Sequence, residues 1–417
     1  MRSRRTLLLI HIKIGYNICK SIPFAFMKLS PFSKDFLRSR TLSNVLKGGY
    51  RYLFGARGKR LVNGLLIFYR LRMLILLRTG EPLSKISRNN EVRLWIDGKK
   101  SFRRIERLIG RAKHSVVVQM FIWKDDQTGR RMASTLLAAA QRGVVIDVNK
   151  EAVGDLFELQ QDFAGTQHSS DPIWKEFWSH PRIHISHVTN NDHSKVYVID
   201  DQLLLVTGMN IANEYRYEWH DYLVELRGST YVAQYLAHEK KLYSSLDAEL
   251  VMNSFDRKNI RPLVNTLLEN AKESVVIEHC YFSDPDVVDR LIALSKRDVR
   301  VTVIMPQFSD FHALSNANTI SRLMKEGKKS NMIVLLYPER FHAKVLFVDY
   351  TTVLVGSANF MKNSLDEMSE TTVLIQGKKG AIRKMYEALR DDALYCRTLS
   401  SPPSFLWMSR WLVWLGL

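Results

Sequence analysis

Cysteine is scarce in this chain of 417 residues, and the few cysteines are not spaced as metal ligands. They are Cys19, Cys280 and Cys396, an odd number with no Cys-x-x-Cys pair. A disulfide framework is therefore excluded, a zinc site has no support, and a reducing compartment is expected. Hydrophobic residues make up 46% of the chain, enough for one large core or two domain-sized cores, which excludes a mostly disordered polymer.

Acidic residues are nearly absent from the first 90 positions. Residues 1–90 hold 19 Lys and Arg against only Asp35 and Glu81, whereas residues 91–417 hold 42 basic and 40 acidic side chains. The net charge of +19 thus divides into +17 in the N-terminal segment and +2 in the rest. A body this close to neutral disfavours a nucleic-acid partner, because binding to a polyanion is driven by a basic surface.

A long apolar run free of charge is also missing. The longest apolar stretch, 61–77, is interrupted by Arg70 and Arg72, and a charge at the bilayer centre costs about 2.5–3.5 kcal/mol. A spanning helix is therefore disfavoured. A basic, apolar segment lying on an anionic membrane surface is favoured, at about 1 kcal/mol for each Lys or Arg near that surface. The alternative is that 61–77 is a buried core helix.

The C-terminal end has a related composition. Positions 405–417 contain three tryptophans, side chains that favour the headgroup level of a membrane. Residues 401–417 are therefore expected to form an interfacial tail, with docking of the tail on the protein as the alternative. Both ends then place the protein at the cytoplasmic face of the cell membrane, as a peripheral or monotopic protein.

The body of the chain repeats itself. AKHSVVVQ at 112–119 matches AKESVVIE at 271–278, and LLAAAQRGVVIDV at 136–148 matches LIALSKRDVRVTVI at 291–304. In each copy a run of β-branched residues typical of a buried strand is followed by a helical pattern and a second strand. The pattern predicts two α/β units whose parallel strands are covered by helices, with a core shared between the halves.

Four parts are therefore expected along the chain. They are a basic apolar membrane-associating segment at 1–90, a first repeat at 91–250, a second repeat at 251–400 and the tail at 401–417. The sequence does not indicate the oligomeric state.

A His-x-Lys pair occurs once in each repeat. His193 and Lys195 open HSKVYVID, and His342 and Lys344 open HAKVLFVD. Side chains two residues apart on a strand share one face, so each pair presents an imidazole and an ammonium together. One such pair would carry little weight, but its recurrence inside a longer repeat indicates a catalytic site.

An aspartate and then a turn of small residues follow each pair. Asp200 and Asp349 end the two motifs, and after an intervening strand-like run come TGMN, which ends in Asn210, and GSAN, which ends in Asn359. Small residues permit close backbone approach, and each asparagine offers amide donors to an oxyanion. For the two aspartates, direct catalysis and anchoring of the following turn are both open.

An acid follows each histidine at the same spacing. The separation between His193 and Asp221 along the chain equals the separation between His342 and Glu370. An imidazole that attacks through one nitrogen needs an acceptor for its other N–H, which fixes its tautomer and orientation. The equal spacing makes these acids the candidates for that role. Surface or satisfied core positions are expected for five other histidines, His184, His187, His220, His279 and His312.

These motifs resemble the paired HKD motifs of the phospholipase D superfamily. HSKVYVID and HAKVLFVDYTTVLVGSAN carry that likeness, and MFIWKDDQTGRRMASTLLAAAQRGV, TGMNIANEY and WHDY resemble bacterial cardiolipin synthases. The likeness spans about 93–400. It implies two homologous phospholipase D-like α/β repeats, each a mostly parallel or mixed sheet flanked by helices, packed as one pseudo-twofold body. The chain departs from the family at two places. Thr207 stands where the family usually has a small residue, and the Asp and Arg often found between the positions of Asn359 and Glu370 are missing.

The resemblance also implies a two-step mechanism through a phosphohistidine. We expect His193 to attack phosphorus and His342 to act as acid and then base. No metal and no cofactor are expected, because lysines supply the positive charge. The implied catalytic residues are His193, Lys195, Asp200, His342, Lys344 and Asp349; the phosphate ligands are Lys195, Asn210, Lys344, Ser357 and Asn359; the orienting acids are Asp221 and Glu370.

The expected function is that of a membrane-associated phosphatidyltransferase, a cardiolipin synthase that joins two phospholipids. Its partners would be phosphatidylglycerol as acceptor, a second phospholipid as donor, and an anionic membrane surface. With water as the acceptor, the same residues would make a hydrolytic phospholipase D, and a phospholipase D-type nuclease is a less favoured alternative. Exclusion of water, which the catalytic residues do not determine, separates transfer from hydrolysis.

Overall fold

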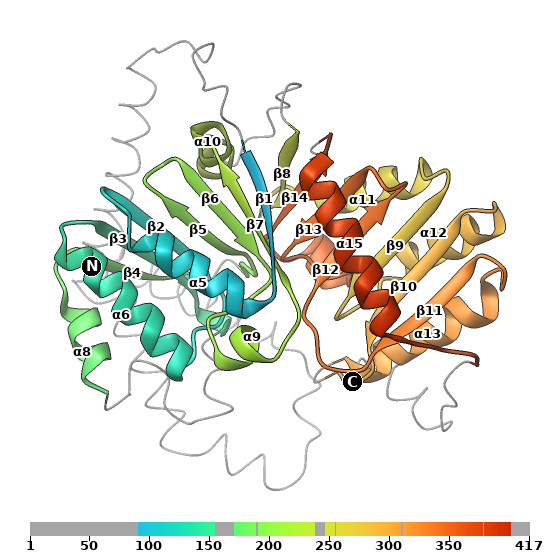
Figure 1. Cartoon of the computed structure of the whole chain (residues 1–417), viewed down its shortest axis with the longest axis horizontal. Helices are drawn as coiled ribbons and strands as arrows, with labels where there is room; N and C mark the ends of the chain where they lie inside the picture. Colours follow the sequence, from blue (N-terminus) through green and yellow to red (C-terminus); the bar gives the residue numbers. More distant parts are fainter. Residues whose placement is uncertain are drawn as a thin grey trace, which may run out of the picture. The chain divides into compact units, whose positions relative to one another are not determined.

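The computed structural model describes residues 91–154, 171–188, 191–237, 247–254, 256–309, 312–377 and 379–401, which form two sheets flanked by helices (Figure 1). The expectations for 1–90 and for 402–417 lie outside these residues. None of the helices in the described ranges has the length and apolar character needed to cross a bilayer.

The first sheet has seven strands in the order β1-β7-β6-β5-β2-β3-β4. β2, β3 and β4 run parallel, and the other neighbours are antiparallel. The strands are β1 (Glu91–Ile96), β2 (Ser115–Met120), β3 (Val145–Glu151), β4 (Ile183–Val188), β5 (Lys195–Ile199), β6 (Leu203–Thr207) and β7 (Tyr222–Arg227). The helices are α5 (Gly98–Ile109), α6 (Gln127–Gln141), α8 (Pro172–Ser179), α9 (Asn213–Tyr217) and α10 (Ser229–Ala237).

The second sheet has the order β8-β14-β13-β12-β9-β10-β11-β15, the same order with one added edge strand. Its strands are β8 (Ala248–Asn253), β9 (Ser274–His279), β10 (Arg300–Pro306), β11 (Met332–Tyr337), β12 (Lys344–Val348), β13 (Thr352–Gly356), β14 (Glu370–Gln376) and β15 (Arg397–Thr398). The helices are α11 (Ile260–Glu269), α12 (Pro285–Lys296), α13 (Ala313–Glu326), α14 (Lys362–Asp366) and α15 (Lys379–Tyr395). The predicted pair of α/β repeats with mixed sheets is confirmed.

Corresponding elements form for the same local reasons in the two repeats. β2 reads SVVVQM and is buried along its whole length, and β9 reads SVVIEH with a single half-buried residue. The helix after each strand begins at an aspartate cap: Asp126 accepts a hydrogen bond from the Gly129 N–H, and Asp284 accepts one from the Val287 N–H. Such caps satisfy backbone donors that a helix start leaves unpaired.

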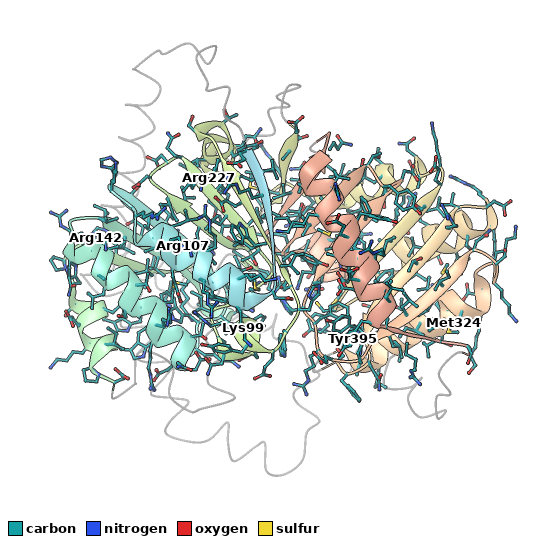
Figure 2. The ribbon with its side chains drawn as sticks, in the orientation of Figure 1. Lys99, Arg107, Arg142, Arg227, Met324 and Tyr395 are labelled. Atoms are coloured by element: carbon teal, nitrogen blue, oxygen red, sulfur yellow. The ribbon has the colours of Figure 1, made fainter. Side chains whose placement is uncertain are left out.

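Three apolar clusters make up the core. One lies within each repeat, between its sheet and its outer helices, and charged side chains such as Lys99, Arg107 and Arg142 lie on the outer side (Figure 2). The third contains residues of both sheets, including Val198 and Val345, and is the shared core that the repeat predicts. The two halves thus pack as one body.

The boundary between the repeats is set by β8. The expected division between residues 250 and 251 falls inside this strand, which pairs with β14 of the second sheet. We therefore place the boundary before Ala248. Helix α15 of the second repeat in turn crosses to the first, where the Lys384 ammonium donates to the Leu94 carbonyl at 2.7 Å.

Candidate active site

Both His-x-Lys pairs lie where the two repeats meet. His193 precedes β5 and donates its backbone N–H to the Ser369 carbonyl of the second repeat at 2.8 Å. His342 precedes β12 and donates its N–H to the His220 carbonyl of the first repeat at 2.8 Å. Because each motif is fixed by a backbone bond to the opposite repeat, the pseudo-twofold arrangement brings the two histidines to one junction.

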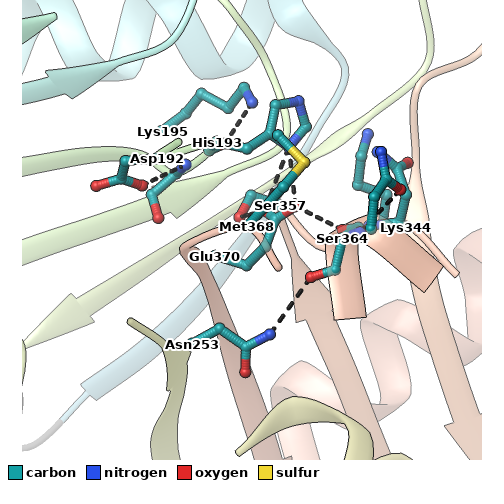
Figure 3. Close-up of polar contacts among 12 residues, drawn as sticks. Asp192, His193, Lys195, Asn253, Lys344, Ser357, Ser364, Met368 and Glu370 are labelled. Atoms are coloured by element: carbon teal, nitrogen blue, oxygen red, sulfur yellow. Dashed lines mark hydrogen bonds and ion pairs between the residues drawn. The ribbon is translucent and has the colours of Figure 1, made fainter. Parts of the chain in front are cut away.

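Each histidine is held by the acid of the other repeat. His193 Nδ1 lies 3.1 Å from Glu370 Oε1 (Figure 3), and His342 Nδ1 lies 3.1 Å from Asp221 Oδ2. The equal spacing along the sequence therefore identifies the acids, but each acid contacts the imidazole that it does not follow in sequence. All four residues are at most 9% exposed, so these contacts are shielded from water.

The carboxylate beside His193 has additional donors. Ser357 Oγ donates to Glu370 Oε2 and Ser364 Oγ donates to Glu370 Oε1, both at 2.5 Å. Burial acts to raise the pKa of Glu370, but His193, Lys195 and the hydrogen bond from Ser357 outweigh it and hold the pKa below its usual value. Glu370 is therefore an anion at neutral pH.

The carboxylate beside His342 is less stabilised. Burial raises the pKa of Asp221 to about 6, although Lys344 opposes the shift. The Lys344 ammonium lies 2.8 Å from His342 Nδ1, the same atom that Asp221 contacts. His342 Nδ1 is therefore shared between a cation and an acid, whereas His193 Nδ1 faces both oxygens of Glu370.

The two lysines place positive charge beside the histidines. Lys195 is fully buried and donates to the His193 carbonyl at 2.5 Å. Burial lowers the pKa of Lys195 to about 7, with Glu370 opposing the shift and Lys344 adding to it. Burial, followed by the neighbouring lysine, also lowers the pKa of each histidine, that of His342 well below its ordinary value. An anionic ligand between the two ammonium groups would offset the burial that disfavours their charged forms.

The two asparagines lie in the site with fixed orientation. The side-chain oxygen of Asn210 accepts the Ile122 N–H at 3.1 Å, and that of Asn359 accepts the Cys280 thiol at 3.3 Å. Since the oxygen of each amide is engaged, the NH₂ group faces the other way. Ser357, predicted as a phosphate ligand, is corrected: its hydroxyl is committed to Glu370.

The turn after β6 requires glycine for a steric reason. A Cβ at Gly208 would lie 2.5 Å from Asp221 Oδ2, and a Cβ at Gly356, at the end of β13, would lie 2.4 Å from the Thr371 carbonyl oxygen. Real Cβ contacts are never this short, so a larger residue would displace the acid or the strand beside it. Thr207, the departure from the family pattern, donates its hydroxyl to the Tyr222 carbonyl and accepts the Met209 N–H.

The two motif aspartates are not part of the site, which corrects their prediction as catalytic residues. Asp200 follows the far end of β5, where its carboxylate accepts the N–H groups of Lys113, His114 and Ser115. Asp349 does the same with the N–H groups before β9. Both have a positive φ, 53° and 49°, so they anchor turns, which was the alternative left open by the sequence.

Replacement of Asp200 by Asn tests this correction. Asparagine tolerates the left-handed backbone but has one acceptor oxygen and no charge for three N–H groups. We expect the free energy of unfolding to fall by about 1–3 kcal/mol, with kcat within about twofold of the wild type. Urea unfolding and steady-state kinetics on the same preparation measure both, and a large loss of kcat in a folded Asp200→Asn variant would restore the catalytic role.

Aromatic side chains, which the sequence did not identify as part of the site, surround His342. The His342 ring contacts Tyr215 edge-on at 5.0 Å, stacks on Trp219 at 5.8 Å and meets Tyr281 at 6.1 Å. His193 has Phe121 at 4.8 Å. In the sequence these aromatic residues look like ordinary core residues and belong to no repeated motif, so a motif search does not find them.

A second polar cluster lies behind His342. His220 Nδ1 is 2.7 Å from Asp97, and its Nε2 faces Tyr222, Glu278 and Asp392. Among the described residues, His220, Glu278 and Asp392 have ligand atoms close enough together to hold a cation. Both carboxylates accept from the Tyr222 hydroxyl, and His220, bonded to Asp97 and Tyr222, is a satisfied core residue, as expected for it.

Two repeats that share a paired His/Lys centre define the class of phospholipase D-like enzymes. The sequence matches the family described as "Cardiolipin synthase, PLD-like domain" over residues 105–243 and 264–391, and the chain belongs to this family. The resemblance seen in the motifs is thereby confirmed.

Named relatives agree with this assignment. The chain is 24% identical over 336 residues to cardiolipin synthase B of Shigella flexneri, covering 73% of this chain and 79% of that protein. It is 26% identical over 329 residues to cardiolipin synthase A of Pseudomonas aeruginosa strain LESB58, covering 72% of this chain and 67% of that protein. These findings support a phosphatidyltransferase of the phospholipase D superfamily.

Solved structures share the fold. The phosphatidylserine synthase of Haemophilus influenzae Rd KW20 superimposes with a TM-score of 0.62 at 14% identity, over 78% of this chain and 92% of that one. The polyphosphate kinase of Porphyromonas gingivalis gives a TM-score of 0.51 at 13% identity, over 72% of this chain and 46% of that one. At these identities the likeness establishes the fold alone.

Proposed function

We propose that the protein is a membrane-associated phosphatidyltransferase that makes cardiolipin, with phosphatidylglycerol as the acceptor and a second phospholipid as the donor. The observation that carries this proposal is the pair of buried histidines, each with its Nδ1 held by an acid from the other repeat and with a lysine beside it. A phosphodiester is anionic and repels nucleophiles, so a centre that combines cations with an oriented imidazole suits it.

In the first step, His193 Nε2 attacks phosphorus and forms a P–N bond. The P–O bond to the departing alcohol breaks, and His342 gives its proton to that alkoxide. In the second step, the acceptor hydroxyl returns a proton to His342 while its oxygen attacks phosphorus and the P–N bond breaks. His342 must be protonated at the start. Burial and then Lys344 lower its pKa, and binding of the phosphate anion raises that pKa again.

His193 suits the nucleophile better than His342 does. Its Nδ1–H faces a carboxylate that is ionised and held by two serine hydroxyls, which leaves Nε2 as the free lone pair. His342 shares its Nδ1 between Asp221 and Lys344, and its proton must move twice in each cycle. The two half-sites are therefore similar in sequence but different in electrostatics.

The pH dependence follows from two buried groups whose pKa values are strongly shifted. Asp221 has a pKa of about 6, so it is protonated and neutral below pH 6. The neutral acid no longer provides a negative charge to hold His342, and kcat/KM therefore falls as the pH drops through 6. Lys195, with a pKa of about 7, loses its charge above pH 7, so kcat/KM also falls on the alkaline side. Bound phosphate favours the charged form of Lys195, so we expect kcat to fall at a higher pH than kcat/KM does on the alkaline side. A kcat/KM that stays constant from pH 5 to 9 would contradict these assignments.

Membrane association is part of the proposal. It is supported by the net charge of +17 and the apolar stretches within residues 1–90, and by the tryptophans near the C-terminus. The cytoplasmic leaflet supplies anionic lipid for such a segment. Deletion of residues 1–90 is the direct test, since a membrane-bound fraction that is unchanged by the deletion would contradict it.

Transfer and hydrolysis are separated by their products. Full-length protein in phosphatidylglycerol vesicles, with EDTA present, is expected to yield cardiolipin and glycerol by mass spectrometry. Phosphatidic acid as the main product would instead make the protein a hydrolytic phospholipase D. Absence of any lipid turnover, together with cleavage of single-stranded or duplex nucleic acid, would favour a nuclease.

A further inference from the structure

A small pocket lies next to two side chains that contact His342. It is lined by side chains that include Trp219, Tyr281, Phe308, Arg340 and Phe341. Two of these also contact the imidazole: Trp219 stacks on it at 5.8 Å and Tyr281 meets it edge-on at 6.1 Å. The pocket therefore borders the histidine that handles the proton of the acceptor hydroxyl.

Two side chains that line the pocket, Arg340 and Trp219, carry polar donors with no partner in the described part of the chain. The exposed guanidinium of Arg340 makes no hydrogen bond or ion pair with any residue in the described ranges. The indole N–H of Trp219 is buried and has no hydrogen-bond partner in the same part of the chain. Buried donors are nearly always paired in proteins, and an unpaired one needs an explanation. An anion with several oxygens would use both donors.

The corresponding positions of the first repeat lack these donors. When the two His-x-Lys motifs are aligned, Trp219 corresponds to Met368 and Arg340 to Asn191. The side chain of Met368 offers no N–H donor, and that of Asn191 carries no charge. The two half-sites thus differ at the positions that a second anion would contact, and the difference favours the His342 side.

We propose that this pocket binds the phosphate of the acceptor lipid, with Arg340 and the Trp219 indole as its ligands. The inference rests on the proposed function and names where its second substrate binds. Phosphatidylglycerol carries a phosphate three carbons from its terminal hydroxyl, so anchoring that phosphate beside His342 brings the hydroxyl to the base. Phe308, which is 57% exposed at the pocket edge, offers an apolar contact for a lipid.

The experiment compares two acceptors that differ in the phosphate. Phosphatidyl-p-nitrophenol in detergent micelles serves as the donor, and either phosphatidylglycerol or free glycerol serves as the acceptor, with products measured by mass spectrometry. We expect Arg340→Gln to lower the ratio of transfer to phosphatidylglycerol over transfer to glycerol at least about tenfold, because only the first acceptor loses a charge-assisted contact. Trp219→Phe, which removes the N–H and keeps the ring, should lower the same ratio.

Arg300→Gln is the matched control. Arg300 is an exposed arginine at the opposite end of the strand that leads to the pocket, β10, and its replacement should leave the ratio unchanged. An unchanged ratio in Arg340→Gln, or an equal loss with both acceptors, would overturn the inference while leaving the transferase intact. Failure of the wild-type protein to transfer to either acceptor would overturn the proposed function itself.

Discussion

Replacement of His193 by alanine is expected to abolish the release of p-nitrophenol from phosphatidyl-p-nitrophenol, with a rate loss of at least about 10⁴-fold. Replacement of His342 by alanine should leave a burst of nearly one equivalent per protein and then stall. The difference arises because nitrophenolate leaves without a proton, so the first step needs the nucleophile alone. The second step needs a base for the acceptor hydroxyl, and only His342 can supply it.

Rapid-mixing absorbance measurements resolve the burst and the steady state. His184→Ala is the matched control, because the half-exposed ring of His184 pairs with Asp147 on the sheet of the first repeat. It should retain both phases. A burst in His193→Ala combined with none in His342→Ala would reverse the two roles, and a burst in both variants would contradict a histidine nucleophile.

Replacement of Glu370 by glutamine is the second large expected effect, a loss of about 10³–10⁴-fold in the burst rate. Glutamine keeps the size but has a single acceptor oxygen, so it retains the hydrogen bond from only one of Ser357 and Ser364, and it removes the charge that holds the Nδ1–H of His193. The NH₂ of glutamine can also turn toward Nδ1 and impose the wrong tautomer, with the proton on the attacking nitrogen. Lys195 loses a favourable charge at the same time.

The control for this variant is Glu326→Gln, whose carboxylate pairs with Arg322 on the surface of α13. Its burst rate should stay within about twofold of the wild type, because exposed ion pairs contribute little. If Glu370→Gln instead slowed only the second step and left the burst intact, the acid would act on His342, as its sequence spacing suggests. That result would contradict the cross-repeat pairing.

The sequence predicts the positions of the chemical groups well because the chain contains two copies. Recurrence of His193 and Lys195 as His342 and Lys344 made a weak motif strong. The equal spacing of the acids identified Asp221 and Glu370, but a symmetric spacing does not reveal which histidine an acid contacts. That depends on backbone pairing across the junction, such as the bond from the His193 N–H to the Ser369 carbonyl, which no local pattern encodes.

Other features depend on geometry that the sequence does not contain. Asp200 belongs to the motif, yet it lies at the far end of a five-residue strand from His193 and binds backbone N–H groups there. Ser357 has the residue type of a phosphate ligand, but a buried carboxylate takes its hydroxyl. The aromatic side chains around His342 come from α9 and the residues that follow it in the first repeat and from the segment after β9 in the second, so their proximity appears only once both sheets are assembled.

In the fold, too, some elements could be predicted from the sequence and others could not. Valine-rich β2 and β9 were readable from composition, because strands buried on both faces are continuously apolar. The edge strand β8 was not, since AELVMN alternates weakly and its place beside β14 is set by long-range pairing. For that reason the expected boundary at 250 and 251 cut through the strand.

The most direct test is to locate the covalent intermediate. Protein reacted with phosphatidyl-p-nitrophenol is quenched in alkali, digested and analysed by mass spectrometry, with His342→Ala used to slow the second step. We expect a phosphatidyl adduct on the peptide that contains His193, abolished in His193→Ala and sharply reduced in Glu370→Gln. Turnover without an adduct, or an adduct on the His342 peptide of the wild type, would contradict a cross-paired centre in which His193 is the nucleophile.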